Sequence, residues 1–231
     1  MQAELFDFGL SDRITQIYTR LKGAIGLLPY PTVREPIDTL VKSIISSRTK
    51  DWQSLRAFEK LKARYPAWAE VMAAPEADIV AIIADVQFPE EKAKNLQLAL
   101  RHIHAFHPDF DLHFLDSEPL PKVLAWYQAL PGAGPKVAAA AVNFSTSNRD
   151  ALVMDTHVLR VFTRLGLIGK RTSAEAAETL LAPALRGWTP EDLSDLHSYV
   201  KKLGQDVCTA NECRCRQCPL GDQCASVWPR R

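Results

Sequence analysis

Cysteine is absent from the first 207 residues of this 231-residue chain, and all five cysteines lie within residues 208–224. A disulfide framework normally spreads its cysteines along the chain, so the clustering argues against one and indicates a metal site in a reducing compartment. No apolar run approaches the roughly 18 residues that a membrane-spanning helix needs. The N-terminal residues also lack the basic and apolar regions of a secretory signal. We therefore expect a cytoplasmic protein that is not held in a membrane.

Segments in which polar and apolar residues alternate, as in half-buried strands, are absent too, and the sequence shows no internal repeats. Apolar residues instead recur at helical spacing, and hydrophobic residues make up 47% of the chain, enough for a sizeable core. The predicted helices cover about ten segments, 14–25 with Ser11 as N-cap, 36–45, 52–61, 79–83, 90–106, 119–129, 136–146, 156–166, 173–185 and 190–205. The predicted fold class is all-α.

The formal net charge of +1 conceals an uneven distribution of charged residues. Residues 41–64 hold seven Lys and Arg against two acids, a local +5, whereas residues 65–91 hold six acids and no Lys or Arg. Separated basic and acidic faces allow a protein to hold a polyanion while its total charge stays near zero. Ordinary solvated helix faces explain the same pattern, and charge alone leaves both interpretations open.

Four cysteines have the spacing of a metal site: Cys208, Cys215, Cys218 and Cys224, in the pattern C-x6-C-x2-C-x5-C. Thiolates so close in sequence converge on one ion or cluster. A structural zinc usually shows two C-x2-C pairs separated by a dozen or more residues, and this loop has one such pair. The compact spacing favours a [4Fe–4S] cluster, although zinc stays open on spacing alone.

The remaining cysteine, Cys213, breaks the pattern, and we interpret it as a free thiol near the site rather than as a ligand. Arg214 and Arg216 lie inside the loop. Their positive charge would offset the negative charge of a thiolate-bound cluster, and it would also suit contact with a phosphate backbone.

A glycine-rich turn, Leu-Pro-Gly-Ala-Gly-Pro-Lys, occupies residues 130–136 between two predicted helices. It lacks the preceding strand and third glycine of a dinucleotide-binding loop, so we interpret it as a helix-hairpin-helix. Gly132 and Gly134 are expected to allow positive φ and close approach of the backbone to a ligand. The first N–H groups of the second helix can then hold DNA phosphates. An ordinary tight turn between helices is the competing interpretation.

Lys136 lies just inside the start of this second helix. The positive end of the helix dipole and partial burial both disfavour a charged ammonium, so we expect the pKa of Lys136 to be lowered. A lysine that is readily deprotonated can act as a Schiff-base nucleophile. A surface contact with phosphate is the alternative role.

Asp155 follows the apolar run Ala151–Met154 and precedes a predicted helix. It is suited to cap that helix. A carboxylate at such a position could also support positive charge that develops on a sugar. His157, two residues later, is interpreted as a structural histidine.

The order of the hairpin with Lys136, the segment around Asp155 and the four cysteines resembles the endonuclease III family of DNA glycosylases. The resemblance extends from about Ile37 to Cys224. It implies a two-domain helix-hairpin-helix fold, with a six-helix barrel domain at 29–148 and an iron–sulfur domain built from 1–28 and 149–231. It also implies that the four cysteines hold a [4Fe–4S] cluster.

The resemblance further implies a base-excision-repair glycosylase with AP lyase activity that flips an oxidised pyrimidine out of the duplex. Lys136 matches the catalytic lysine of the family, and Asp155 matches the catalytic aspartate. The lysine argues against the adenine-mismatch branch of the superfamily, which lacks it. The implied partner is double-stranded DNA with damaged bases or abasic sites, bound by a monomer in a bacterial or archaeal nucleoid.

Two segments depart from the family pattern. Arg48 stands where the family usually has glutamine to fill the gap left by the flipped base, and an arginine can stack there with a different preference. In residues 86–91, Gln87 or Phe88 takes the place of the usual apolar wedge. These departures leave an alternative, a paralogue that binds DNA structure or damage with weak or no glycosylase activity. An iron–sulfur electron carrier is disfavoured by Lys136 and the hairpin.

Overall fold

The computed structural model describes residues 2–29 and 32–226, with side chains from residue 9 onward. The described residues contain helices and two isolated bridge pairs but no β-strand, so the predicted all-α class is confirmed. The chain divides into two compact units. The central unit is Thr32–Arg149, and the terminal unit combines Met1–Pro31 with Asp150–Arg231. Nothing among the described helices is long and apolar enough to cross a membrane.

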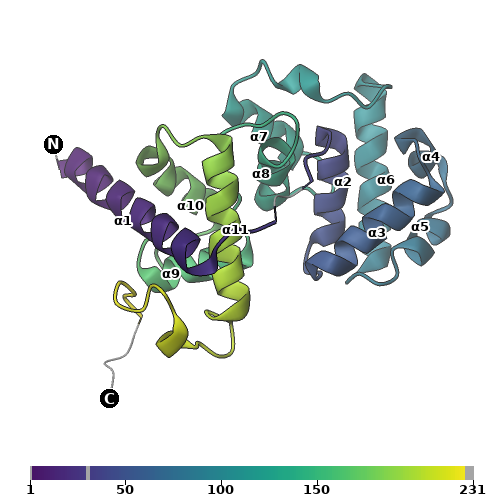
Figure 1. Cartoon of the computed structure of the whole chain (residues 1–231). Coiled ribbons are helices and arrows are strands. Elements are labelled where there is room, and N and C mark those ends of the chain that lie inside the picture. Colours follow the sequence, from purple (N-terminus) through teal and green to yellow (C-terminus); the bar gives the residue numbers. More distant parts are fainter. Residues whose placement is uncertain (1, 30–31, 227–231) are drawn as a thin grey trace. The chain divides into compact units, whose positions relative to one another are not determined.

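The central unit is built around one buried helix. Its elements are α2 (Pro36–Ser46), α3 (Asp51–Arg64), α4 (Trp68–Ala73), α5 (Glu76–Ile82), α6 (Pro89–Phe106), the 3-10 helix η1 (His113–Leu115), α7 (Leu120–Gln128) and α8 (Pro135–Asn143). Every residue of α8 from Val137 to Asn143 is buried, and the helix packs against α2 and α7 (Figure 1). Four consecutive alanines favour the helix and let its neighbours approach closely. Only the first turn of α8 therefore reaches the surface.

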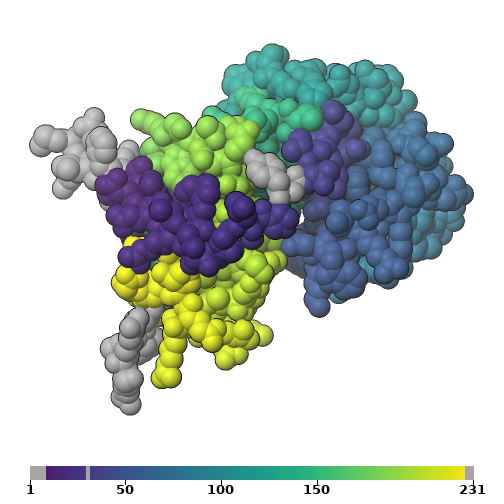
Figure 2. Space-filling view, viewed as in Figure 1, coloured from purple at the N-terminus to yellow at the C-terminus, as the bar shows by residue number. Residues whose placement is uncertain are grey.

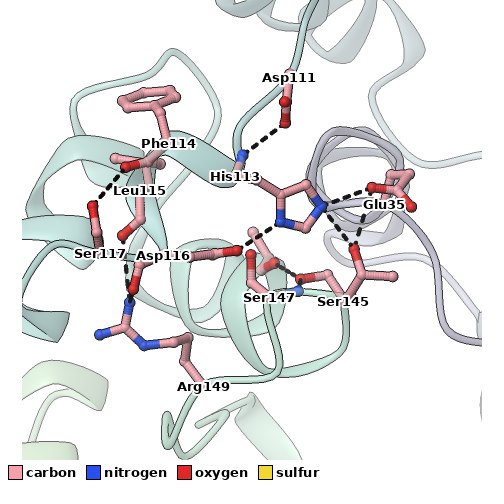
Figure 3. A network of polar contacts seen from close by, with 12 residues as sticks. Glu35, Asp111, His113, Phe114, Leu115, Asp116, Ser117, Ser145, Ser147 and Arg149 are labelled. Carbon is pink, nitrogen blue, oxygen red and sulfur yellow. Dashed lines mark hydrogen bonds and ion pairs between the residues drawn. The ribbon is translucent and has the colours of Figure 1, made fainter.

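The segment between α6 and α7 is ordered by polar contacts centred on His113 (Figure 3). Its Nδ1 lies 2.6 Å from Asp116 Oδ2, and its Nε2 lies 2.9 Å from Glu35 Oε2. Thr146 Oγ1 donates to the same Glu35 oxygen over 3.2 Å, while the Arg149 guanidinium donates to the carbonyl of Asp116 over 3.0 Å. The network joins this segment to Glu35, near the start of the central unit, and to Thr146 and Arg149 at its end.

The terminal unit joins the two ends of the chain. Its elements are α1 (Gln2–Ile25), α9 (Thr156–Leu165), α10 (Ala174–Leu181), the 3-10 helices η2 (Ala182–Leu185) and η3 (Cys215–Gln217), and α11 (Pro190–Asp206). Ile14, Ile17 and Leu21 of α1 are buried in a core shared with α9, η2 and α11. Figure 2 shows α1, in purple, lying against the green and yellow C-terminal segment. Burial of this apolar stripe provides the main stabilisation of the N-terminal helix.

Two predictions about helices are wrong. The first helix begins at Gln2 rather than after Ser11, so Ser11 lies inside α1 and does not cap it. The short helix α4 was not expected, because its six residues are too few to show a helical period. Contacts with another helix stabilise α4, because the buried side-chain amide of Gln97 on α6 donates to the carbonyls of Val71 and Ala74 over 3.0 and 2.7 Å.

Candidate active site and cysteine centre

The glycine turn before α8 forms a tight hairpin in which the two glycines differ. Gly132 has φ +78, and a Cβ there would lie 3.0 Å from Asn95 Cβ and 3.4 Å from Ile44 Cγ2. Both the conformation and the close packing therefore require glycine. Gly134 is the N-cap of α8 with φ −75, and a Cβ there would meet nothing within 4 Å. Gly134 therefore does not adopt the positive φ that glycine allows, and its expected close approach to a ligand stays a prediction.

Lys136 is the second residue of α8 and is half-buried. Pro135 precedes it at the first helical position, where a missing N–H leaves no hydrogen bond unmade. The rest of the helix is buried, so the lysine extends from the one turn that reaches the surface. Gly132 and Gly134 beside it are exposed. The amine of a lysine and an exposed helix N-terminus thus belong to the same short segment of the central unit.

Asp155 is the N-cap of α9. Its Oδ1 accepts the backbone N–H groups of His157 and Val158 over 2.8 and 2.9 Å. Burial opposes ionisation, but the positive charge of His197 and the hydrogen bond from Val158, with Lys201 and His157, hold the pKa of Asp155 below its usual range. The structure therefore shows the predicted capping role and also a carboxylate that stays charged.

Two of the groups around Asp155 were missed in the sequence. His197 and Lys201 are four residues apart on α11, which places them on one face of that helix. His197 is buried, with its Nδ1 2.7 Å from the carbonyl oxygen of Val153. The four-residue spacing of two basic residues is a visible signal, but the sequence does not show that this face packs beside Asp155.

Two arginines of α9 hold the start of the cysteine loop. Arg160 donates from Nε to the carbonyl of Cys208 over 2.9 Å and from Nη2 to that of Gly204 over 2.7 Å. Arg164 donates from Nη1 to the carbonyl of Thr209 over 2.7 Å and to Cys208 Sγ over 3.2 Å. The helix that begins at Asp155 thus also supports the cysteines, and it supplies a positive charge beside a thiol.

The four cysteines of the predicted metal site are neighbours. Burial raises the pKa of the Cys218 thiol, and the charges of Cys208, Cys224 and Cys215 raise it further. No group of three or more His, Cys, Asp or Glu side chains in residues 9–29 and 32–226 is arranged to hold a metal ion. Thiols lose their protons when positive charge lies beside them, so the four cysteines are chemically suited to bind a cationic metal centre.

The structure places Cys213 close to the predicted ligands. Its Sγ lies 2.8 Å from Cys215 Sγ, and its backbone forms an isolated bridge with Cys208. Arg214 and Arg216 are both exposed, as contact with DNA would require.

The residues predicted to enter DNA lie together in the central unit. Arg48 follows α2, and Phe88 is the N-cap of α6. The guanidinium carbon of Arg48 lies 5.7 Å from the centre of the Phe88 ring, in a cation–π contact. Gln87 is exposed beside them, and its backbone N–H donates to Thr49 Oγ1 over 3.1 Å.

A cavity of about 560 Å³ lies elsewhere in the central unit. It is lined by the start of α2 and by residues 66–69 and 108–113. None of the residues predicted for the site lines it.

The fold and the site define a two-unit helical protein with a helix-hairpin-helix and a cysteine-rich C-terminal loop. Residues 41–186 match the family described as HhH-GPD superfamily base excision DNA repair protein, and the chain belongs to this superfamily. It is 29% identical over 189 residues to endonuclease III-like protein 1 of Bos taurus, covering 81% of this chain and 58% of the relative. It is 27% identical over 191 residues to endonuclease III of Thermotoga maritima, covering 82% and 83%. The predicted resemblance to endonuclease III is confirmed.

The chain spans 58% of the length of the bovine relative, 63% of one from Gallus gallus and 48% of one from Arabidopsis thaliana. Solved structures agree on the fold. A trapped endonuclease III–DNA covalent intermediate superposes with a TM-score of 0.77 at 22% identity, covering 94% of this chain and 96% of the other. A thermostable thymine-DNA glycosylase superposes with a TM-score of 0.71 at 17% identity, covering 94% and 95%.

Proposed function

We propose that this protein is a bifunctional DNA glycosylase and AP lyase that removes oxidised pyrimidines from double-stranded DNA. The observation that carries the proposal is the position of Lys136, half-buried in the first turn of α8 directly after the Gly132 hairpin. This places an amine beside backbone N–H groups that suit a phosphate. In the alternative of a binding protein alone, Lys136 would contact a phosphate and would form no Schiff base.

In the proposed reaction, the neutral Nζ of Lys136 attacks C1′ of the deoxyribose of a flipped nucleotide. The glycosidic bond breaks, its electron pair leaves with the base, and the proton lost from the amine neutralises the departing base. Ring opening yields an iminium between Nζ and C1′ as O4′ takes a proton from water. Loss of a C2′ proton then expels the 3′ phosphate, and water hydrolyses the remaining Schiff base to free Lys136. The charged carboxylate of Asp155 stabilises the positive charge that develops on the sugar. The low pKa of Asp155 supports this role.

The remaining predicted residues are proposed to hold the DNA. The backbone around Gly132 and Gly134 binds phosphate, and the exposed Arg214 and Arg216 add positive charge. Arg48 and Phe88 enter the base stack, where Arg48 fills the gap left by the flipped base. We propose a monomer acting in the compartment that holds the DNA. A bacterial or archaeal nucleoid remains a prediction, because relatives from animals and plants are also similar.

We also propose that Cys208, Cys215, Cys218 and Cys224 hold a [4Fe–4S] cluster. Its role is to cross-link the C-terminal loop, so that Arg214 and Arg216 are kept at the surface. The neighbouring thiols and the Arg164 guanidinium beside Cys208 support this. Anaerobically purified protein is expected to be brown, with iron and sulfide in equal amounts. Stoichiometric zinc without sulfide would refute the cluster.

The activity is tested by reduction of the Schiff base. Wild-type protein is incubated with a duplex that contains an abasic site in the presence of borohydride, and the covalent adduct is separated by electrophoresis. We expect an adduct for wild type and for Lys122→Gln, an exposed lysine of α7 used as a control, but none for Lys136→Gln. Absence of an adduct at high protein concentration in wild type would favour the alternative, a paralogue that binds DNA structure or damage with weak or no activity.

The preferred lesion is the finer part of the proposal. The names of the endonuclease III relatives support oxidised pyrimidines, whereas a thymine-DNA glycosylase of Aeropyrum pernix is 22% identical over 200 residues. Excision rates are compared on duplexes that contain 5-hydroxycytosine, a G·T mismatch or 8-oxoguanine. Fastest excision from the 5-hydroxycytosine duplex is the expected result.

A further inference from the structure

Lys92 is a buried lysine in the first turn of α6, and it donates hydrogen bonds to neutral oxygen atoms. Its Nζ donates to the carbonyls of Ile45 and Ser47, each over 2.7 Å, and to Thr49 Oγ1 over 2.9 Å. An ammonium has three N–H donors, and each has one acceptor here. Burial lowers the pKa of Lys92 to about 8, so it is mostly charged at neutral pH. The carbonyls at the end of α2 carry the negative end of the helix dipole and favour this charge.

The hydroxyl of Thr49 is saturated in the same way. It accepts from Lys92 Nζ and from the backbone N–H of Gln87, and it donates to the carbonyl of Ser47 over 3.2 Å. A hydroxyl offers one donor and two acceptor positions, and all three are used. Lys92 and Thr49 therefore connect the loop after α2 to the loop before α6, and their hydrogen bonds fix the conformation of both loops.

Each of these loops carries a residue in a strained conformation. Arg48 has φ 54 and Phe88 has φ 57, in the left-handed region that side chains with a Cβ rarely adopt. Such conformations persist only where the surrounding contacts determine them. Arg48 lies between two residues that Lys92 holds, and Phe88 follows Gln87, which Thr49 holds. The result is the Arg48–Phe88 stack, in which Phe88 remains 50% exposed.

We propose that Lys92 is a positioning residue for base flipping, which fixes Arg48 and Phe88 as one preassembled wedge. It acts without touching DNA, through the carbonyls of the loop after α2 and through Thr49. The inference rests on the proposed function, because that function is what sends Arg48 and Phe88 into the duplex. Without the ammonium, the two loops lose their common anchor and the guanidinium leaves the ring.

Wedge insertion can be measured without chemistry. The full-length, metal-loaded protein is titrated into a duplex with a tetrahydrofuran abasic analogue, which cannot form a Schiff base, and with 2-aminopurine opposite it. Unstacking of the 2-aminopurine raises its fluorescence. The variants are Lys92→Met, Thr49→Val, and Lys94→Met as a matched control, an exposed lysine two residues further along α6.

Wild type and Lys94→Met are expected to give the same fluorescence rise. In Lys92→Met and Thr49→Val, the rate of insertion should fall by about tenfold to a hundredfold, the effect of a misplaced recognition group. A second readout is the borohydride adduct with a single-stranded abasic oligonucleotide, which needs no wedge. It should form at the wild-type rate in all variants, and a purely structural defect would reduce it as well.

The outcomes separate this inference from the proposed function. Wild-type insertion by Thr49→Val and Lys92→Met overturns the positioning role, even if the adduct forms normally. No fluorescence rise with the wild-type protein overturns it too. Wild-type protein could also raise the 2-aminopurine fluorescence in a way that depends on Lys92, yet form no borohydride adduct. That result would refute the lyase proposal and would support the positioning role of Lys92. If Lys92→Met does not fold, the partly exposed Thr49→Val decides the question alone.

Discussion

At the scale of single residues, the active-site candidates have structural duties that can be separated from their chemistry. Asp155 both caps α9 and carries a charge, and the capping hydrogen bond from Val158 also helps to hold its pKa low. An asparagine side chain can keep the cap without the charge. Lys136 is half-buried in the first turn of α8, whereas the residues from Val137 to Asn143 that follow it are buried. Substitutions that keep one property and remove the other therefore test function directly.

Asp155→Asn is expected to keep the cap and to lose the charge. Asparagine caps helices about as well as aspartate, so the free energy of unfolding should change by less than about 1 kcal/mol. Formation of the borohydride adduct should slow by roughly 10²-fold or more, because the developing cation loses its counter-charge. Thermal unfolding and adduct kinetics measure the two effects, and Asp155→Ala should lower both. An asparagine variant with wild-type kinetics would contradict the proposed role.

The cysteines offer a matched pair at the same scale. Cys218→Ala should abolish the iron and sulfide content, because it removes one of four proposed ligands. Cys213→Ala should retain both, although its sulfur lies 2.8 Å from Cys215. Metal analysis and visible absorbance of anaerobic preparations give the answer. A colourless Cys213→Ala protein would show that the fifth cysteine binds the cluster.

At the scale of elements, the hairpin before α8 concentrates its strain in one glycine. Gly132→Ala forces a side chain into the left-handed region and against Asn95, so we expect destabilisation of about 1–3 kcal/mol. Gly134→Ala has ordinary backbone angles and open space, so we expect a smaller loss of below about 1 kcal/mol, because alanine is only a poorer N-cap than glycine. Denaturant unfolding of the two variants measures the difference. Equal effects would mean that the positive φ of Gly132 does not matter.

The helices also differ in how well they can be predicted from the sequence. Long amphipathic helices such as α6 and α11 were predicted to within a residue or so, because burial of one face imposes a 3.6-residue period. The six-residue α4 was missed, since it depends on hydrogen bonds from Gln97 on another helix. The start of α1 was misplaced because Ser11 has the chemistry of a cap, yet the helix continues through it.

At the scale of the whole molecule, His113 ties together the first and last segments of the central unit (Figure 3). Hydrogen bonds that the imidazolium donates to Asp116 and to Glu35 raise the pKa of His113 above its usual 6.5. A raised pKa in the folded state means that the contribution to stability is complete below about pH 6.5 and is lost as pH rises through the folded pKa.

The expected result is a melting temperature that falls, as pH rises above about 6.5, more steeply in wild type than in His113→Gln. Glutamine keeps a hydrogen-bonding side chain but does not titrate. Differential scanning calorimetry at several pH values measures the difference. Parallel curves for the two proteins would show that the network does not link stability to protonation of His113.

The sequence by itself determined the helical class, the hairpin, Lys136, Asp155 and the four cysteines. These depend on local chemistry: the period of a helix, the conformational freedom of Gly132, the capping geometry of a carboxylate and the spacing of thiols. Each of these features depends on residues that are close together in the chain. The roles of these residues in catalysis and metal binding remain predictions.

The tertiary structure alone decided what surrounds them. Lys92 and Thr49 lie 43 residues apart in the chain, yet one hydrogen bond joins them and sets both loops of the wedge. Arg164 reaches the cysteine loop across 44 residues, and His197 and Lys201 bring charge to Asp155 from another helix. Packing of distant helices creates these contacts, and the periodicity of one helix does not reveal which residues of another will meet it.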